Sequence, residues 1–405
     1  MGLSEYEPPI DPMKVRKQYS KSLKEGVILL TAHSHRAWPN VAWLGQKKAI
    51  ELAQGNLDRK WGVIFGEVIP RFQELVSSRI GSNDSSLLAN DENTHNLVTK
   101  VLSCYNWDSR TRFVTTSSEF HSLKRQLLRL KKEGVNVDFV GTEEKNTLTQ
   151  RIVEATIPGT SAVLVSTVFY DVGYVLQDLP KIVNKARSVG ATVLFDAYHQ
   201  FNTRRLNVDA LGDDIFVVGG GYKYGSAGEG AAWLKVPKNC SLEPRITGWL
   251  ADFESLEKKE YPYPVLYGTG ASRFLGATRD ISGICRQVAV LEFMEEEGMS
   301  VDLIEQNTHY QLEYLQGLFD DFALAEQGLT LISSRKRSER GPFLAVGLDS
   351  KERAHQIAEL LHRDHDIWVD YRGNILRIGP APYTTKTELD YAMNSLKKVV
   401  KVTNQ

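Results

Sequence analysis

The chain has little cysteine and no excess of charge of either sign. Only three of its 405 residues are cysteine, namely Cys104, Cys240 and Cys285, and their spacing suggests no pair. A sparse, odd cysteine count argues against a disulfide framework and suits a reducing compartment, so we expect a cytoplasmic protein. The net charge is −1. A nearly neutral chain is a poor candidate for binding nucleic acid or a charged membrane surface.

Long hydrophobic runs and clusters of metal-ligating residues are also lacking. No apolar run approaches the roughly 18 residues expected of a membrane span, and the first residues have no signal-peptide core. We therefore predict no membrane partner. His33 and His35 lie close together, but no cysteine or acid joins them at ligand spacing, so we predict no metal site. The length allows one large domain and a smaller one.

Apolar β-branched runs alternate with helical periods through most of the chain. This alternation predicts an α/β fold, in which a mostly parallel sheet is covered by helices on both faces. After residue 279, two helices lead into a smaller α+β unit. Helices are expected within 41–80 and at 178–189, 279–297, 300–322, 351–363 and 385–400, and strands at 112–116, 137–140, 162–166, 192–195, 215–218, 231–236, 329–333, 342–348 and 366–378.

Two of these predicted strands end in charged residues. The run at 192–195 stops at Asp196, and the run at 215–218 leads through three glycines to Tyr222 and Lys223. Asp196 and Lys223 are 223 − 196 = 27 residues apart, which allows one strand–loop–strand excursion. Both charged groups can therefore lie at the same edge of one sheet.

A buried carboxylate that faces a buried lysine suits pyridoxal phosphate (PLP). Burial lowers the pKa of the lysine, so its amine can condense with the aldehyde, and the carboxylate keeps the pyridine nitrogen protonated. We expect the glycines at 219–221 to let the backbone approach this cofactor, and the Tyr222 hydroxyl to contact its phosphate. On these residues alone, a glycine-rich turn with a solvated lysine remains an alternative.

The segments Asp196-Ala197-Tyr198-His199 and Gly221-Tyr222-Lys223-Tyr224 resemble the class V branch of fold-type I PLP enzymes, and within it the kynureninases. The resemblance implies a large domain with a mostly parallel, seven-stranded sheet and a small α+β C-terminal domain. It also implies a homodimer with sites at the interface. We expect an N-terminal arm at 1–40 that joins the small domain, a PLP-binding domain at 41–285 and the small domain at 286–405.

The same resemblance implies several cofactor-binding residues. Asn93 and Thr94 begin a predicted helix and would hold the phosphate at its N-terminus, although a simple helix cap is the alternative. Phe120 would stack on the pyridine ring, a role for which His121 competes. His199 would lie near the ring 3-hydroxyl. Trp249 would donate its indole N–H to the phosphate.

Substrate-binding residues are implied at the two ends of the chain. The run 376–382, Leu-Arg-Ile-Gly-Pro-Ala-Pro, resembles the kynureninase C-terminal motif, and this match makes Arg377 the fork that grips a substrate α-carboxylate. Arg372 would support the loop. Ser34 and His35 would lie in a loop at the mouth of the site. Four residues stand where a polar group that recognises an aromatic ring is expected: Leu123, Phe169, Asp171 and Ala277.

The resemblance implies a hydrolase that cleaves the Cβ–Cγ bond of kynurenine or a related β-acyl amino acid, and so releases alanine and an aryl acid. Lys223, Asp196 and Tyr222 would be its catalytic residues. The alternative is a class V aminotransferase or another PLP-dependent β-lyase. A cysteine desulfurase is disfavoured because residues 330–380 contain no cysteine. A non-catalytic PLP-binding regulator is disfavoured because it has no need of the Arg377 clamp.

Overall fold

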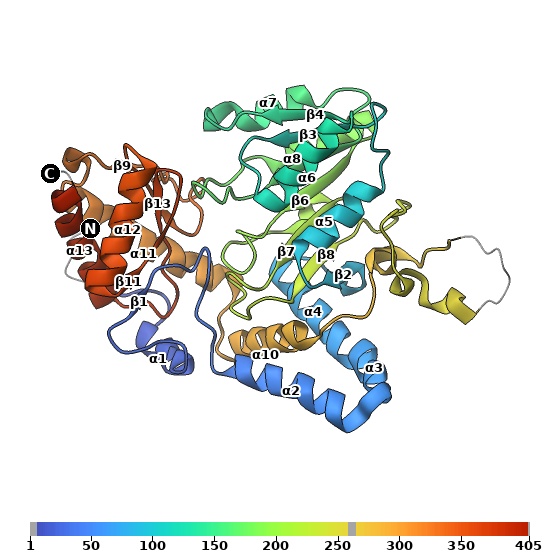
Figure 1. Cartoon of the computed structure of the whole chain (residues 1–405), viewed down its shortest axis with the longest axis horizontal. Helices are drawn as coiled ribbons and strands as arrows, with labels where there is room; N and C mark the ends of the chain where they lie inside the picture. Colours follow the sequence, from blue (N-terminus) through green and yellow to red (C-terminus); the bar gives the residue numbers. More distant parts are fainter. Residues whose placement is uncertain (1–5, 258–264, 404–405) are drawn as a thin grey trace.

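The computed structural model describes residues 6–257 and 265–403. Its central feature is a seven-stranded sheet in the order β2-β8-β7-β6-β5-β3-β4 (Figure 1). All neighbouring strands are parallel except β8, which is antiparallel to both β2 and β7. The predicted α/β fold with a mostly parallel sheet is confirmed. The strands are β2 (Leu88–Asp91), β3 (Arg112–Thr116), β4 (Asn136–Val140), β5 (Ala162–Ser166), β6 (Thr192–Asp196), β7 (Phe216–Gly220) and β8 (Ala232–Lys235).

Both faces of this sheet are buried, which explains its continuous apolar runs. Along β6, Val193 and Phe195 belong to the core on one face and Leu194 to the core on the other. Helices α5 and α6 supply the second core, while α4, α7, α8 and α10 supply the first. The helices are α2 (Val41–Asn56), α3 (Lys60–Val63), α4 (Ile69–Ile80), α5 (Thr94–Ser103), α6 (His121–Lys132), α7 (Leu148–Ala155), α8 (Leu179–Val189), α9 (Val208–Leu211) and α10 (Ser282–Glu296).

The C-terminal part forms a separate four-stranded antiparallel sheet, in the order β12-β13-β10-β9, packed against helices α11 to α13 (Figure 1). Its elements are α11 (Val301–Asp321), β9 (Thr330–Leu331), β10 (Leu344–Gly347), α12 (Lys351–His365), β11 (Ile367–Trp368), β12 (Asp370–Arg372), β13 (Ile375–Ile378) and α13 (Lys386–Thr403). These positions confirm the α+β unit that the sequence pattern predicts.

The N-terminal segment packs on this C-terminal unit. After the short helix α1 (Pro12–Arg16), strand β1 (Ile28–Leu29) pairs in parallel with β11. A further bridge joins Thr31 to Gly379, next to the Arg377 strand. The segment therefore brings residues 31–36 beside the β12–β13 hairpin. The domain boundaries at residues 40 and 285 stay predictions, and residue 285 falls inside α10, which packs against α2.

None of the helices in residues 6–257 and 265–403 combines the length and apolar composition of a membrane span. Over the same ranges, the structure gathers no group of three or more histidine, cysteine, aspartate or glutamate side chains that could hold a metal ion.

Candidate active site

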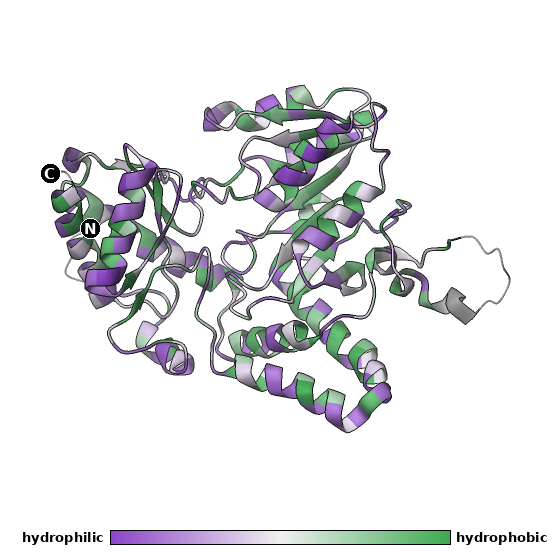
Figure 2. Cartoon of the chain, viewed as in Figure 1, coloured by the Kyte–Doolittle hydropathy of each residue, from purple (hydrophilic) through white to green (hydrophobic). Residues whose placement is uncertain are grey.

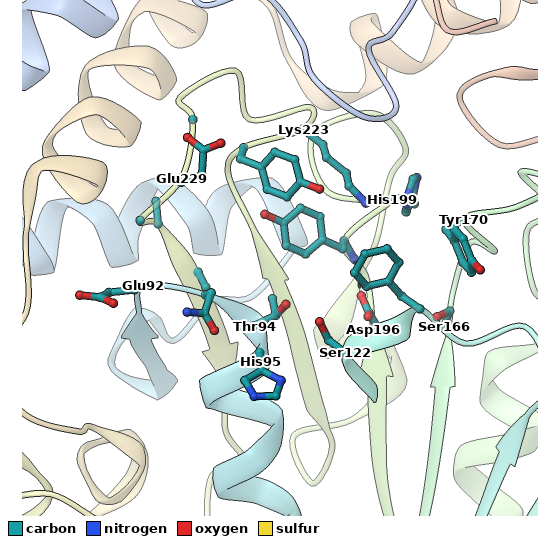
Figure 3. Close-up of a pocket in the computed structure, with 18 of the residues that line it drawn as sticks. Glu92, Thr94, His95, Ser122, Ser166, Tyr170, Asp196, His199, Lys223 and Glu229 are labelled. Atoms are coloured by element: carbon teal, nitrogen blue, oxygen red, sulfur yellow. Dashed lines mark hydrogen bonds between the residues drawn. The ribbon is translucent and has the colours of Figure 1, made fainter. Parts of the chain in front are cut away.

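A cavity of about 200 Å³ lies where the parallel strands end. The carboxyl ends of parallel strands share one edge, and in open α/β sheets this edge is the usual ligand-binding site. Strand register brings Ser166 of β5 beside Asp196 of β6, and Asp196 beside Val218 of β7. The cavity is lined by Glu92, Asn93, Thr94, His95, Phe120, Ser122, Ser166, Val168, Tyr170, Asp196, Tyr198, His199, Tyr222, Lys223 and residues 228–232 (Figure 3).

Lys223 is buried in this cavity with only 5% of its surface exposed. Its Nζ atom lies 2.7 Å from Nε2 of His199. Burial lowers the pKa of Lys223 to about 7, although the nearby Asp196 carboxylate acts in the opposite direction. A large fraction of this amine is therefore unprotonated at neutral pH, which is the state that attacks an aldehyde.

Asp196 ends β6, and its Oδ1 atom accepts a hydrogen bond of 2.9 Å from the backbone N–H of Tyr198. Burial raises the pKa of this carboxyl, while the Tyr198 N–H and the charge of Lys223 lower it. A protonated pyridine nitrogen is the kind of partner that keeps such a buried carboxyl ionised. Asp196 and Lys223 thus occupy the shared edge that the sequence pattern predicts.

Three aromatic rings surround the Lys223 amine. Nζ lies 4.9 Å from the ring centroids of Phe120 and Tyr198, and 5.6 Å from that of Tyr222. Phe120 lines the cavity, whereas His121 is exposed and is not among the lining residues. The geometry therefore favours Phe120 over His121 as the residue that stacks on a flat ring held at Lys223.

The N-terminus of α5 points toward the cavity (Figure 3). Asn93 is its N-cap, and the Asn93 side chain accepts a hydrogen bond of 2.9 Å from the backbone N–H of Asn96. The cap therefore uses the Asn93 amide oxygen, while the Thr94 hydroxyl and the N–H groups of the first turn can meet an anion. The predicted helix cap and the predicted phosphate site are compatible at this position.

A buried ion pair anchors this helix start. Lys100 donates to Asp91 over 2.6 Å, and Asp91 also accepts from the Glu92 N–H and the Asn96 side chain. Sequence analysis did not single out this pair. The only signal for it is an acid at the end of a strand nine residues before a lysine, which is common in helical proteins.

His199 is the predicted neighbour of the ring 3-hydroxyl, and it lines the cavity. Its Nε2 atom faces Lys223, while its buried Nδ1 atom has no hydrogen-bond partner among the described residues. Burial places the pKa of His199 well below its ordinary value, so the ring is neutral. A buried polar atom without a partner is costly, and a bound polar group can satisfy it.

The three glycines before Lys223 lie against protein side chains. A Cβ atom on Gly219 would collide with Trp233, one on Gly220 with Tyr198, and one on Gly221 with Gln287. The glycines therefore make room for protein side chains packed against β7. Their role in a close approach of the backbone to the cofactor stays a prediction.

Four predicted residues lie outside the cavity lining, namely Arg377, Trp249, His35 and Ser34. Trp249 is 43% exposed and lines a separate hollow beside Trp61 and Phe65, so within one chain it does not join the others. His35 lies at the mouth, with its ring 5.4 Å from that of Tyr222. The Ser34 hydroxyl donates to the backbone oxygen of Thr31 over 3.3 Å.

The four residues that stand where a polar, ring-recognising group is expected do not line the cavity. Leu123 and Phe169 are both 1% exposed and belong to the hydrophobic cores. Ala277 lines the Trp249 hollow, and Asp171 bonds to its own neighbour, the Val172 N–H. None of the four positions therefore supplies a polar group to the cavity lining. Tyr170 lines the cavity instead.

Arg377 is 2% exposed, and its guanidinium group is paired with a carboxylate of the same chain. Its Nε and Nη2 atoms donate to the two carboxylate oxygens of Asp370 over 2.8 and 2.5 Å, and Nη1 donates to the backbone oxygen of Tyr170 over 2.5 Å. Asp370 also contacts His33 Nε2 at 2.6 Å. Sequence analysis assigned no role to Asp370 or His33.

The family model named "Aminotransferase class-V" matches residues 90–382 of this chain. The chain belongs to the class V aminotransferase family. The matched range covers every residue of the cavity lining and Arg377. The chain is therefore a class V PLP-dependent enzyme, and a buried amine of low pKa, a buried carboxyl, stacking rings and a free helix N-terminus fit PLP.

Curated relatives of two kinds are similar to this chain. A kynureninase of Burkholderia mallei is 25% identical over 421 residues, which cover 97% of this chain and 92% of that protein. A probable mitochondrial cysteine desulfurase of Dictyostelium discoideum is 22% identical over 345 residues, which cover 84% of this chain and 75% of that protein.

Solved structures support the fold. The apo cysteine desulfurase of Thermococcus onnurineus superimposes with a TM-score of 0.80, at 19% identity, and covers 99% of this chain and 100% of that chain. A C-DES variant with glycine linked to its PLP cofactor has a TM-score of 0.79, at 15% identity, and covers 94% of this chain and 98% of that chain. This similarity confirms the fold-type I architecture.

The lowered pKa of Lys223 predicts how the PLP-free protein captures PLP as pH changes. The protonated amine cannot attack an aldehyde, so the capture rate should rise with pH, reach half its limit near pH 7 and then level off. Because the Asp196 charge raises this pKa, Asp196→Asn should move the midpoint to lower pH. Stopped-flow absorbance measures the rate. A rate that keeps rising to about pH 10, as for an exposed lysine, would contradict the assignment.

Proposed function

We propose that this protein is a kynureninase-like hydrolase, which cleaves the Cβ–Cγ bond of kynurenine or a related β-acyl amino acid. The observation that carries the proposal is the grouping of Lys223, Asp196 and His199 in one cavity, with Arg377 joined to its rim through Tyr170. The similarity to a kynureninase over nearly the whole of both chains supports it. Alanine and an aryl acid would be the products.

The distribution of cysteine favours this reaction over cysteine desulfuration. A desulfurase needs a cysteine nucleophile that can reach the substrate sulfur. All three cysteines of this chain lie within the described residues, and none of them lines the cavity. Burial raises the pKa of the thiol of Cys104 to about 12 and that of Cys285 to about 11, which makes both poor nucleophiles.

The residues of the cavity have separate roles in this proposal. PLP, when bound, supplies an electron-accepting ring that stabilises negative charge at the substrate Cα. Asp196 would hold the proton on the ring nitrogen, and Phe120 would fix the orientation of the ring and shield it from water. Lys223 takes the proton from the substrate Cα, because its amine is unprotonated near neutral pH.

Neighbouring residues position these groups. His199 contacts the Lys223 amine and, being neutral, does not repel it. The Thr94 hydroxyl and the first N–H groups of α5 hold the phosphate. Tyr222 lines the same cavity, so its hydroxyl can contact the phosphate or the substrate. Arg377 binds the substrate carboxylate.

Product analysis tests this proposal. The PLP-loaded enzyme is incubated with L-kynurenine, and alanine and anthranilate are quantified against time. We expect both products in equal amounts. Formation of the corresponding keto acid, with conversion of PLP to pyridoxamine phosphate, would instead identify an aminotransferase. Formation of alanine from cysteine, with sulfide released when a thiol reductant is added and without turnover of kynurenine, would identify a desulfurase.

We further propose that the protein forms a homodimer through an exposed apolar face. Trp43 and Ile50 lie seven residues apart on α2 and therefore on one side of the helix, and Leu57 follows its last residue, Asn56. All three are exposed, and Trp43 is 59% exposed. Figure 2 shows green, apolar segments along α2 and α3. Exposed apolar surface of this kind marks association sites.

The exposed position of Trp249 suggests which site it serves. Trp249 contacts Phe253, itself 61% exposed, and the two lie beyond the cavity of their own chain. In a dimer, Trp249 could donate its indole N–H to the phosphate in the partner's cavity. This arrangement would reconcile its predicted role with its observed exposure.

The double variant Trp43→Glu/Ile50→Glu is expected to be monomeric, because it places two charges in the proposed interface. Sedimentation velocity measures the change. Leu128→Glu is the matched control, since Leu128 is a half-exposed leucine on α6. The control should leave the association state of the wild type unchanged. A monomeric wild type, or a double variant that is still dimeric, would refute this interface.

A further inference from the structure

The β12–β13 hairpin carries a charge cluster on one face. Asp370 lies directly across the hairpin from Arg377 in the strand register. Arg372 is two residues further along β12, so its side chain is on the same face as Asp370. Through Tyr170, which lines the cavity, the cluster is joined to the site. The three charged residues therefore form one group at its edge.

The contacts within this cluster are unequal. Arg377 makes two hydrogen bonds to Asp370 and is almost fully buried. Arg372 lies further away, with its Nη2 atom 3.5 Å from Asp370 Oδ2, and 46% of its side chain is exposed. Its Nη1 atom donates only to the backbone oxygen of its neighbour Tyr371 among the described residues. Arg372 can therefore accept a stronger anionic partner.

The cluster carries an unbalanced positive charge. Two arginines face one aspartate, and the fourth member, His33, is neutral because burial lowers its pKa to about 4. The nearby Arg377 and Arg372 also lower the pKa of Lys223, so their positive charge acts on the Lys223 amine inside the cavity. One incoming carboxylate would neutralise the cluster. A carboxylate that reaches Arg377 must, however, compete with Asp370 for the same N–H groups.

We propose that Asp370 is a resident carboxylate that Arg377 exchanges for the carboxylate of the substrate, and that Arg372 receives Asp370 when the exchange occurs. His33 holds the Oδ1 atom of Asp370, while Oδ2 already lies between the two arginines. A rotation that keeps Oδ1 at His33 and at the Nε atom of Arg377 moves Oδ2 to Arg372, and it frees the Nη2 atom of Arg377 for the substrate carboxylate. This inference rests on the proposed role of Arg377, and it makes Asp370 and Arg372 determinants of carboxylate affinity.

Calorimetric titration of the PLP-loaded enzyme tests the exchange without requiring turnover. The probes are 3-benzoylpropionate, which has the carboxylate and aryl ketone of kynurenine without its α-amine and ring amine, and propionate, which has the carboxylate alone. The variants are Asp370→Asn, Arg372→Gln and the double variant. Asparagine keeps the shape of aspartate and can still bond to His33, so it removes the competing charge with little change in packing.

We expect Asp370→Asn to tighten the binding of both probes about tenfold, because the competitor for a charged hydrogen bond is weakened. Arg372→Gln should weaken binding about tenfold, because Asp370 loses its alternative partner. In the Asp370→Asn background, Arg372→Gln should have little further effect. This loss of additivity is the specific signature of exchange.

Other outcomes would overturn the inference. If Asp370→Asn weakens binding, Asp370 is a permanent partner that orients Arg377. If Arg372→Gln weakens binding equally in both backgrounds, Arg372 contacts the ligand itself and does not receive Asp370. No effect of Arg372→Gln, or no binding of propionate to the wild type, also refutes the exchange. Arg372 is half exposed, so its variant tests the inference even if Asp370→Asn does not fold.

The two probes separate this inference from the proposed function. If 3-benzoylpropionate binds no better than propionate, the site does not recognise an aryl ketone, and the kynureninase-like reaction loses its support. In that case, the relative affinities of the wild type and the variants for propionate still test the exchange. Conversely, a preference for 3-benzoylpropionate with additive variants would support the substrate class and refute the exchange.

Discussion

Lys223→Ala is expected to lower kcat/KM by about 10⁴-fold or more, because it removes both the covalent attachment of PLP and the base at the substrate Cα. The variant should also lose the visible absorption band of lysine-bound PLP. Steady-state kinetics and the absorption spectrum measure the two effects. They should appear together, since one buried amine accounts for both.

Lys238→Ala is the control for this variant. Lys238 is an exposed lysine shortly after β8, and it is not among the residues that line the cavity. Its removal should leave both the band and the rate unchanged. Retention of the visible band in Lys223→Ala would mean that another lysine holds the cofactor. The assignment of Lys223 would then be wrong.

Asp196→Asn is expected to lower kcat by about 10²–10³-fold, because a neutral amide no longer stabilises the protonated ring as charge develops in the transition state. The cofactor should remain bound, since Lys223 and the α5 N-terminus are intact. Its absorption band should shift with the protonation state of the ring. Rapid kinetics with spectra recorded on the same sample measure both effects.

Glu119→Gln is a demanding control, because Glu119 is a second buried carboxyl near Asp196. It accepts hydrogen bonds from Thr116 and Ser166, and burial raises its pKa to about 7. Glu119 does not line the cavity, so the variant should change kcat far less than Asp196→Asn does. If Glu119→Gln has the larger effect, Glu119 and not Asp196 controls the charge of the ring.

Local sequence patterns predict most of the fold. Strands β3 and β5 have the bounds predicted at 112–116 and 162–166, and helix α8 begins one residue after its predicted start. Continuous apolar β-branched runs have few alternatives to a buried strand, and glycine or polar residues mark their ends. The meeting of Asp196 and Lys223 follows from the same information, because parallel neighbours end at one edge.

Contacts that depend on packing are harder to predict. The glycines at 219–221 fit a cofactor motif, yet they face Trp233, Tyr198 and Gln287. A single sequence does not show which side chain packs against a given residue of a strand. Leu123 and Phe169 stand where the family resemblance implies a polar group, and the structure buries both in the cores.

The pairing of Asp370 with Arg377 is an intermediate case. Gly373 and Asn374 form the turn between β12 and β13, and the register across this hairpin places the two charged residues opposite each other. The two turn residues predict a hairpin at this position, and the register of that hairpin predicts this pair. The contact with His33 could not have been predicted, because it depends on how the N-terminal segment packs beside β13.

The central claim is that Lys223 is the residue that holds PLP. Borohydride reduction of the PLP-loaded enzyme fixes the cofactor to its lysine, and peptide mapping by mass spectrometry then locates it. We predict a single phosphopyridoxyl group on the peptide that contains Lys223. A modified lysine elsewhere in the chain, or no modified lysine at all, would contradict the account of this site.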